Sequence, residues 1–185
     1  MMPEISLNIL DVAENSVRAD ASLVTIKAAA DSAADTLTVV ISDNGCGMTK
    51  EQVEHVTDPF FTTRKTRRVG LGVPFFKLAA ELSGGSFEIR SEVGKGTDVI
   101  AVFGLSHVDR MPLGDMPSTI HTLVTMHEDI DFIYTYTYDE DSFTMDTAQF
   151  REVLGDISFQ EPEVSNYILD YLKENTAEVT KGRPI

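Results

Sequence analysis

The stretch Asp43-Asn44-Gly45-Cys46-Gly47-Met48 decides how the rest of this 185-residue sequence is interpreted. It directly follows an alternating apolar run, residues 36–42, which predicts a β-strand. A carboxylate therefore stands at the end of a strand and is followed by glycines without side-chain bulk. Such a carboxylate can accept a hydrogen bond from an exocyclic amino group such as that of adenine, and the glycines let backbone approach a flat ring. A simple strand-to-helix turn remains the alternative, because short glycine motifs recur by chance.

Composition narrows the classes of protein. The length suits one domain, or one domain with an appendage, and a hydrophobic content of 42% can form a core. No apolar run is long enough to span a bilayer, there is no signal-peptide pattern, and one cysteine cannot form an intramolecular disulfide. These features predict a cytoplasmic protein without membrane contact. A net charge of −15 argues against a nucleic-acid partner, because an acidic chain repels phosphate backbones.

The charge is unevenly distributed along the chain. Residues 1–106 hold 14 acidic and 10 basic residues, whereas residues 107–185 hold 16 and 5, a net charge of −11. We therefore divide the chain into a first domain, 1–106, and an acidic extension, 107–185. Within the first domain, four basic residues fall in the five positions 64–68, which suggests a small anionic ligand.

The first helix, predicted over residues 7–18, carries polar side chains on one stripe. Its apolar residues fall on one broad arc, as in an amphipathic helix. On the opposite arc, Asp11 and Asn15 are one turn apart and Arg18 follows, so the three side chains can converge on one point. Ser6 is expected to cap this helix. A solvated polar face is the alternative, although Asn is a poor helix former and is therefore more informative than Lys or Glu.

The remaining periodicity predicts alternating strands and helices. Strands are expected at 23–29, 36–42, 86–92, 97–105 and 130–138, and helices at 49–55, 70–83, 115–128, 146–155 and 162–175. The first two strands are joined so tightly that they should be antiparallel. Gly70 and Gly72 open a helix, and free N–H groups at a helix start form a phosphate site. Residues 58–68 show no period and predict a mobile loop.

In this order, the segments resemble the boxes of the GHKL superfamily of ATPases, which share the Bergerat fold and include histidine kinases, anti-sigma-factor kinases, MutL, gyrase B and heat-shock chaperones. The resemblance covers residues 6–105. Each box alone is a weak signal, but four in order together with a hairpin are specific. The matching segments are Asp11–Arg18 for the N box, Asp43–Gly47 for the G1 box, Pro59–Thr63 for the F box, Gly70–Gly72 for the G2 box, and Glu92–Thr97 for the closing hairpin of histidine-kinase catalytic domains.

The resemblance implies a site for ATP and Mg²⁺. Asp43 would accept from the adenine amino group with support from Thr97, and Asn15 would hold the Mg²⁺ that bridges the phosphates. Further nucleotide contacts are implied at Arg18, Gly45, Gly47, Met48, Phe61, Arg64, Lys65, Gly70, Leu71 and Gly72.

Two departures from the family pattern bear on the activity. Asp11 stands where hydrolysing members usually carry a glutamate general base, and Glu14 is a weaker candidate because it lies about 100° off the polar stripe. No dimerisation helix with a phospho-acceptor histidine precedes the domain, and the acceptor-like pair His127-Glu128 comes after it. We therefore expect a histidine-kinase-like protein kinase or slow ATPase that acts on a separate protein. The alternative is an ATP-dependent regulatory module without phosphoryl transfer.

The fold implied is a two-layer α/β sandwich, with helices on one face of a mixed, mainly antiparallel sheet and a small α/β extension after it. The charge of the extension and its aromatic strand, residues 132–138, predict a docking surface for a basic partner. Extension of the core is the alternative. A looser resemblance to proteins encoded beside iron-hydrogenase-like redox enzymes in anaerobic bacteria suggests a redox-associated partner.

Overall fold

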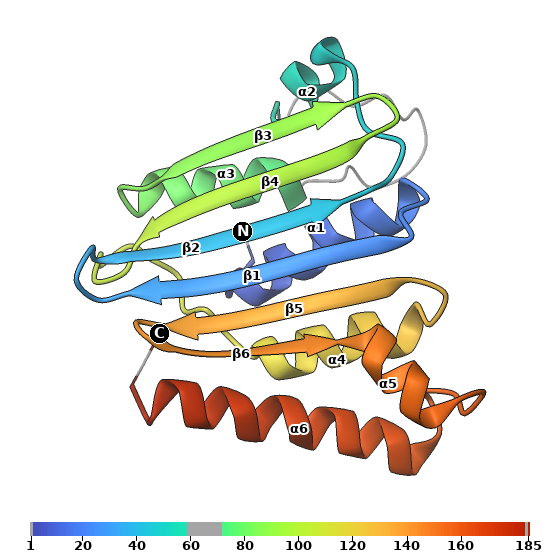
Figure 1. Cartoon of the computed structure of the whole chain (residues 1–185). Coiled ribbons are helices and arrows are strands. Elements are labelled where there is room, and N and C mark those ends of the chain that lie inside the picture. The colour runs from blue at the N-terminus through green and yellow to red at the C-terminus, as the bar shows by residue number, and fades with distance from the viewer. Residues whose placement is uncertain (1, 59–71, 184) are drawn as a thin grey trace.

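A six-stranded sheet in the order β3-β4-β2-β1-β5-β6 forms the framework of the part of the chain that the computed structural model describes, residues 2–58, 72–183 and 185 (Figure 1). Along the chain the elements are α1 (Ile5–Arg18), β1 (Leu23–Asp31), β2 (Thr36–Asp43), α2 (Lys50–Val56), α3 (Gly72–Leu82), β3 (Ser86–Glu92), β4 (Gly96–Gly104), α4 (Met116–Met126), β5 (Asp131–Tyr138), β6 (Asp141–Asp146), α5 (Thr147–Leu154) and α6 (Pro162–Thr180).

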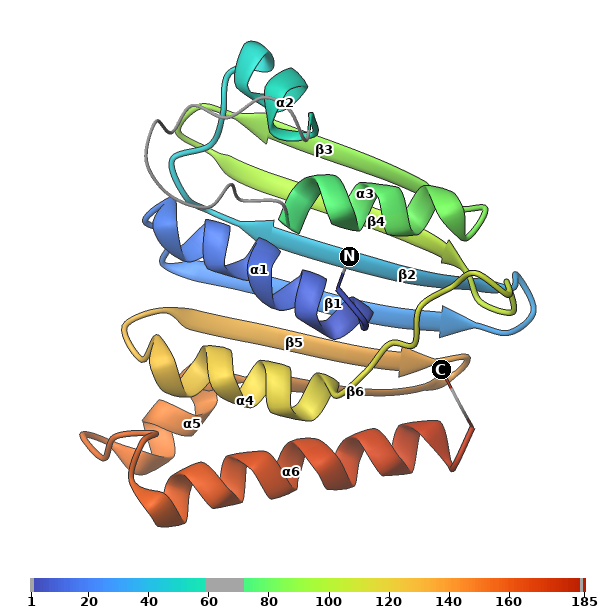
Figure 2. The same cartoon turned by 180° about the vertical axis from the view of Figure 1, so that it is seen from behind.

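The helices cover one face of this sheet, as the sequence predicted. Alternate residues of β1 and β2 are buried, because every second side chain of a strand points to the same face. Figure 2 shows α1, α3 and α4 lying across that face, and Figure 1 shows the opposite face free of helices. The α/β sandwich with a mixed, mainly antiparallel sheet is therefore confirmed. Among the described residues, no helix is both long and apolar enough to cross a membrane.

The segment after residue 107 continues the same sheet. β5 pairs in parallel with β1 through eight residue pairs, from Leu23 with Asp131 to Ala30 with Tyr138. The other neighbouring strands pair antiparallel. Tyr134 and Tyr136 of the aromatic strand are buried in the core, so this face of β5 extends the core of the sheet.

Three local expectations were wrong. Ser6 does not cap the first helix: α1 begins at Ile5, and Ser6 is buried. The N–H groups of these two residues donate to the carbonyl oxygens of Pro112 and Leu113, at 3.0 and 2.8 Å, which makes a side-chain cap unnecessary. The strand β6 was not expected, and α6 continues beyond the expected end at 175 to Thr180.

Candidate functional site

Asp43 is the last residue of β2, between Val24 of β1 and Thr97 of β4 in the sheet register. Its Oδ1 accepts a hydrogen bond from the N–H of Gly45 at 2.9 Å, and its Oδ2 accepts one from the Ser16 hydroxyl at 2.6 Å. Each carboxylate oxygen can accept more than one hydrogen bond. The side chain is therefore held in place and can still accept from a ligand.

Sequence reasoning missed Ser16, although a signal was present. It stands seven residues after Ile9, two turns further along α1, and therefore lies on the apolar arc of the helix. A buried hydroxyl on such an arc needs a partner. Here the partner is Asp43, so α1 orients the carboxylate at the end of β2.

Gly45 and Gly47 let the loop after β2 lie close to its neighbours. A Cβ on Gly45 would come within 2.6 Å of the carbonyl oxygen of Ala19, at the end of α1. Gly47 has φ +66°, and a Cβ there would lie 2.0 Å from the carbonyl oxygen of Glu92. Between them, the N–H of Cys46 donates to Ala19 at 2.8 Å. The glycines thus serve the packing of this loop against α1 and the β3–β4 turn.

A hydroxyl pair connects the same loop to β4. The N–H of Met48 donates to Oγ of Ser91 at 2.8 Å, and this Oγ lies 2.8 Å from Oγ1 of Thr97. Because Thr97 pairs with Asp43 across the sheet, the structure brings these predicted residues to one end of the sheet. Ser91 is a further member of the site that the sequence pattern did not single out.

The polar stripe of α1 reaches the start of α3. Nη1 of Arg18 donates to Oδ1 of Asn15 at 3.2 Å, so these two side chains converge as predicted. Asp11 lies against Gly72, the first residue of α3: a Cβ on that glycine would fall 1.9 Å from Oδ2 of Asp11. A carboxylate is favoured at the positive end of a helix dipole. Asp11, Asn15 and the helix start are therefore neighbours.

The donor chemistry of these residues fits Mg²⁺. Asn15 offers an amide oxygen, and oxygen atoms are the ligands that Mg²⁺ prefers. In the described ranges, no three His, Cys, Asp or Glu side chains gather into a metal cluster. A magnesium ion here would take much of its coordination from phosphate and water, as Mg²⁺ commonly does.

Some predicted site residues lie outside the described residues. They are Phe61, Arg64, Lys65, Gly70 and Leu71, together with the rest of the F box. Glu14, the weaker candidate for a base, points elsewhere: its Oε1 lies 2.7 Å from Nε2 of His127.

The fold and this end of the sheet define a nucleotide-binding class of domain, and comparison with known proteins agrees. Residues 4–107 match the family described as Histidine kinase-, DNA gyrase B-, and HSP90-like ATPase, and the chain belongs to this family. The GHKL resemblance is thereby confirmed, and the family implies ATP binding.

Two curated relatives are kinases or sensors. Sporulation kinase D of Bacillus subtilis is 37% identical over 68 residues, which are 37% of this chain and 13% of that protein. Sensor protein SrrB of Staphylococcus aureus is 38% identical over 65 residues, 32% of this chain and 11% of that protein. The match thus spans about an eighth of the length of these relatives.

A solved structure extends the likeness beyond the family match. The N-terminal domain of a DNA repair protein aligns with 96% of this chain and 57% of its own, with a TM-score of 0.54 and 12% identity. At this identity the likeness shows the fold alone. It includes most of the segment after residue 107.

Proposed function

We propose that this chain is a Mg·ATP-binding, histidine-kinase-like module that acts on a separate protein. The observation that carries the proposal is the Asp43 carboxylate, which Ser16 and Gly45 hold at the end of β2. A fixed carboxylate suits recognition of the adenine amino group, because the acceptor does not have to be ordered when the ligand binds. Family membership and the kinases among the relatives support the same reading.

Phosphoryl transfer or slow hydrolysis is the chemistry that we favour. Asp11 of α1 lies against Gly72, the first residue of α3, where the family resemblance places the nucleotide phosphates. Its carboxylate can therefore activate a water or hydroxyl group beside them. His121 and His127 are engaged in hydrogen bonds with Ser165 and Glu14, which argues against either as a freely presented acceptor. We propose that the acceptor is on a partner protein. An ATP-dependent switch without transfer is the second candidate, because aspartate is shorter than the usual glutamate.

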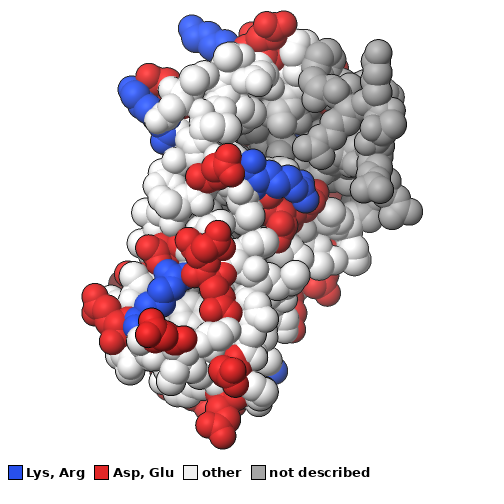
Figure 3. Space-filling view, turned by 90° about the vertical axis from the view of Figure 1, so that its right-hand side faces the viewer, with Lys and Arg blue, Asp and Glu red and all other residues white. Residues whose placement is uncertain are grey.

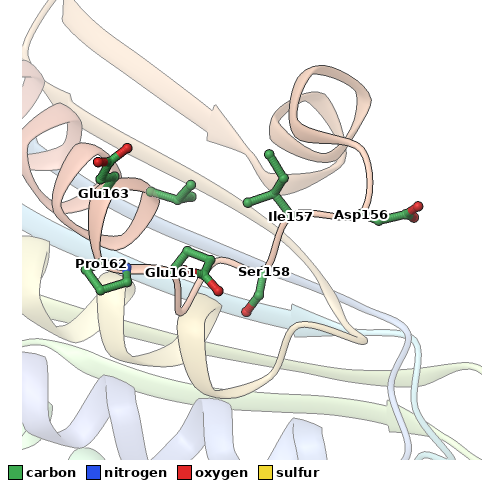
Figure 4. Close-up of a pocket in the computed structure, with 7 residues that line it drawn as sticks. Asp156, Ile157, Ser158, Glu161, Pro162 and Glu163 are labelled. Atoms are coloured by element: carbon green, nitrogen blue, oxygen red, sulfur yellow. The ribbon is translucent and has the colours of Figure 1, made fainter.

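The docking surface that we propose is the loop between α5 and α6. A surface pocket of about 660 Å³ is lined there by Ile157 and Val164 together with carboxylates (Figure 4). Asp156, Glu161 and Glu163 supply these carboxylates, and among the described residues none of the three forms an ion pair. Figure 3 shows acidic side chains gathered over the lower half of this side of the molecule. A partner segment with basic and apolar residues fits such a surface, and its association should weaken with salt.

Calorimetric titration of Asp43→Asn with Mg·ATP tests the nucleotide site. A charge-assisted hydrogen bond contributes about 1.5–3 kcal/mol, so we expect affinity to fall roughly 10- to 150-fold. Asp98→Asn is a matched control. Asp98 follows Thr97, the partner of Asp43 in β4, and its carboxylate lies on the opposite face of the sheet. Equal ATP affinity in wild type and a folded Asp43→Asn variant would disprove the adenine contact.

Capture of a partner in the presence of γ-labelled ATP separates the two candidate functions. Label on the captured protein indicates a kinase, whereas ATP-dependent capture without label indicates a switch. The Glu161→Lys/Glu163→Lys double variant tests the docking surface. Capture unchanged by this charge reversal would place the docking surface elsewhere.

A further inference from the structure

A contact between the two parts of the chain reaches the nucleotide site. Oε1 of Glu14, in the last turn but one of α1, lies 2.7 Å from Nε2 of His127, which caps the end of α4. The two side chains are largely buried, with 26% and 20% of their surfaces exposed. Glu14 immediately precedes Asn15, the residue expected to hold Mg²⁺. The acidic extension, residues 107–185, is thus joined by a side-chain hydrogen bond to α1 at the position next to Asn15.

The turn that carries His127 is itself held firmly in place. The guanidinium of Arg151 donates to the carbonyl oxygens of Glu128 and Ile130. Oγ of Ser158 donates to the carboxylate of Glu128 at 2.6 Å, which links the α5–α6 loop to the same turn. Because its backbone is clamped from α5 and from this loop, His127 can act as a fixed support for α1.

We infer that His127 is a positioning residue through which the segment after residue 107 sets the affinity for Mg·nucleotide; this rests on the proposed ATP site. Side chains at successive helix positions point about 100° apart. Fixing Glu14 against α4 therefore fixes the rotation of the last turns of α1 and the direction in which Asn15 points. Without the contact, the last turns of α1 would still be held through Ser16, whose hydroxyl bonds Asp43, but the side that carries Glu14 would lose its support and could shift, as helix ends do. Loss of the contact should then weaken the metal-dependent part of nucleotide binding.

The test is calorimetric titration of the full chain with ATP, once with excess Mg²⁺ and once with EDTA. We expect His127→Ala to weaken Mg·ATP binding roughly two- to thirtyfold, the range of effects of mutations between two coupled sites, and to change metal-free binding less. His127→Gln, which can still donate to Glu14, should recover most of the affinity. His121→Ala is the matched control, because this histidine of α4 bonds Ser165 of α6 instead of α1 and should leave affinity within about twofold.

A double-mutant cycle with Glu14→Ala approaches the contact from the other helix. His127→Ala should add little once Glu14 is already alanine, because the two variants remove the same bond. Additive effects, or unchanged Mg·ATP affinity in folded His127→Ala, would overturn the inference while leaving the proposed function intact. If His127→Ala does not fold, the comparison uses Glu14→Ala against His127→Gln. A wild-type chain that binds no Mg·ATP would overturn the proposed function and this inference together.

Discussion

At the scale of single residues, alanine substitutions at Gly47 and Gly94 distinguish the cost of a left-handed backbone from the cost of a steric clash. Both have positive φ, +66° and +79°, but a Cβ on Gly47 meets the carbonyl oxygen of Glu92, whereas one on Gly94 meets nothing within 4 Å. Alanine in left-handed backbone costs about 1–2 kcal/mol, which we expect for Gly94→Ala. Gly47→Ala should cost at least about 1 kcal/mol more, because backbone has to move. Denaturant unfolding of both variants measures the difference, and equal costs would contradict the contact.

Asp11→Asn addresses the chemistry at the same scale. If Asp11 is a general base, wild-type turnover of ATP is slow but measurable, and the variant should lose roughly 10²-fold or more. Its affinity for Mg·ATP should be unchanged or slightly tighter, because the variant removes a negative charge beside the start of α3, where the phosphates are expected. Turnover and calorimetry on the same preparation provide both measurements. Equal turnover in the two proteins would exclude Asp11 as the base.

The sequence predicted the positions of the candidate residues in the fold better than the partners of those residues. Asp43, Asn15 and Arg18 could be found because strand alternation and helical spacing place them without knowledge of the fold. Glu14 is the weaker candidate for a base because it lies off the polar stripe, and in the structure it faces His127 at the end of α4. That contact joins residues 113 positions apart, and it depends on the parallel pairing of β1 with β5, which no local pattern reveals.

At the scale of elements, a charge cluster joins the end of α6 to the β5–β6 turn. Arg183 pairs with Asp139 and Asp141 at 3.1 and 3.2 Å, and Nζ of Lys181 lies 2.7 Å from Asp141. Hydrogen bonds from Ser32 are the main cause that lowers the pKa of Asp139, and the bond from Lys181 is the main cause for Asp141. The cluster therefore binds the β1–β2 turn, the β5–β6 turn and the C-terminal residues together.

This cluster predicts a pH dependence of stability. A carboxylate whose pKa is lower in the folded chain stabilises it above the unfolded-state pKa, about 3.9 for aspartate, and this contribution disappears as pH falls through the folded value. Wild type should therefore be more stable than Asp139→Asn at pH 7, and the difference should shrink towards pH 3. Urea unfolding at both pH values measures it, and Glu140→Gln, the adjacent exposed carboxylate in the same turn, is the control. A difference that persists unchanged at pH 3 would exclude ionisation of Asp139 as its source.

The elements that sequence reasoning missed have weak local patterns. β6 spans only six residues with an aspartate at each end, Asp141 and Asp146, a pattern more typical of a turn and a helix cap than of a strand. It forms a strand because β5 offers an edge for pairing, from Ile133 with Asp146 to Tyr138 with Asp141. The predicted end of α6, residue 175, is too early because the residues that follow are mostly polar. Val179 is an apolar residue among them, and it is buried in the core.

At the scale of the whole molecule, the expected division at residue 106 separates two stretches of sequence that share one sheet. β5 adds to β1 through eight residue pairs, and α4 lies beside α1 on the same face (Figure 2). The backbone N–H groups at the start of α1 are satisfied by residues 112 and 113. Truncation at residue 106 would therefore expose the paired edge of β1 and leave the start of α1 without its partners.

This continuity predicts that the chain unfolds in a single step. The sequence contains no tryptophan, and all its tyrosines lie after residue 107, at Tyr134, Tyr136, Tyr138, Tyr167 and Tyr171. Tyrosine fluorescence therefore reports only on the extension, whereas hydrogen exchange of the amides in β2 and β4 reports only on the first part. Because β1 and β5 contribute side chains to one core, both signals should change at the same denaturant concentration. Loss of the tyrosine signal while β2 and β4 stay protected would show that residues 107–185 unfold separately, and residues 1–106 would then be a domain in the thermodynamic sense.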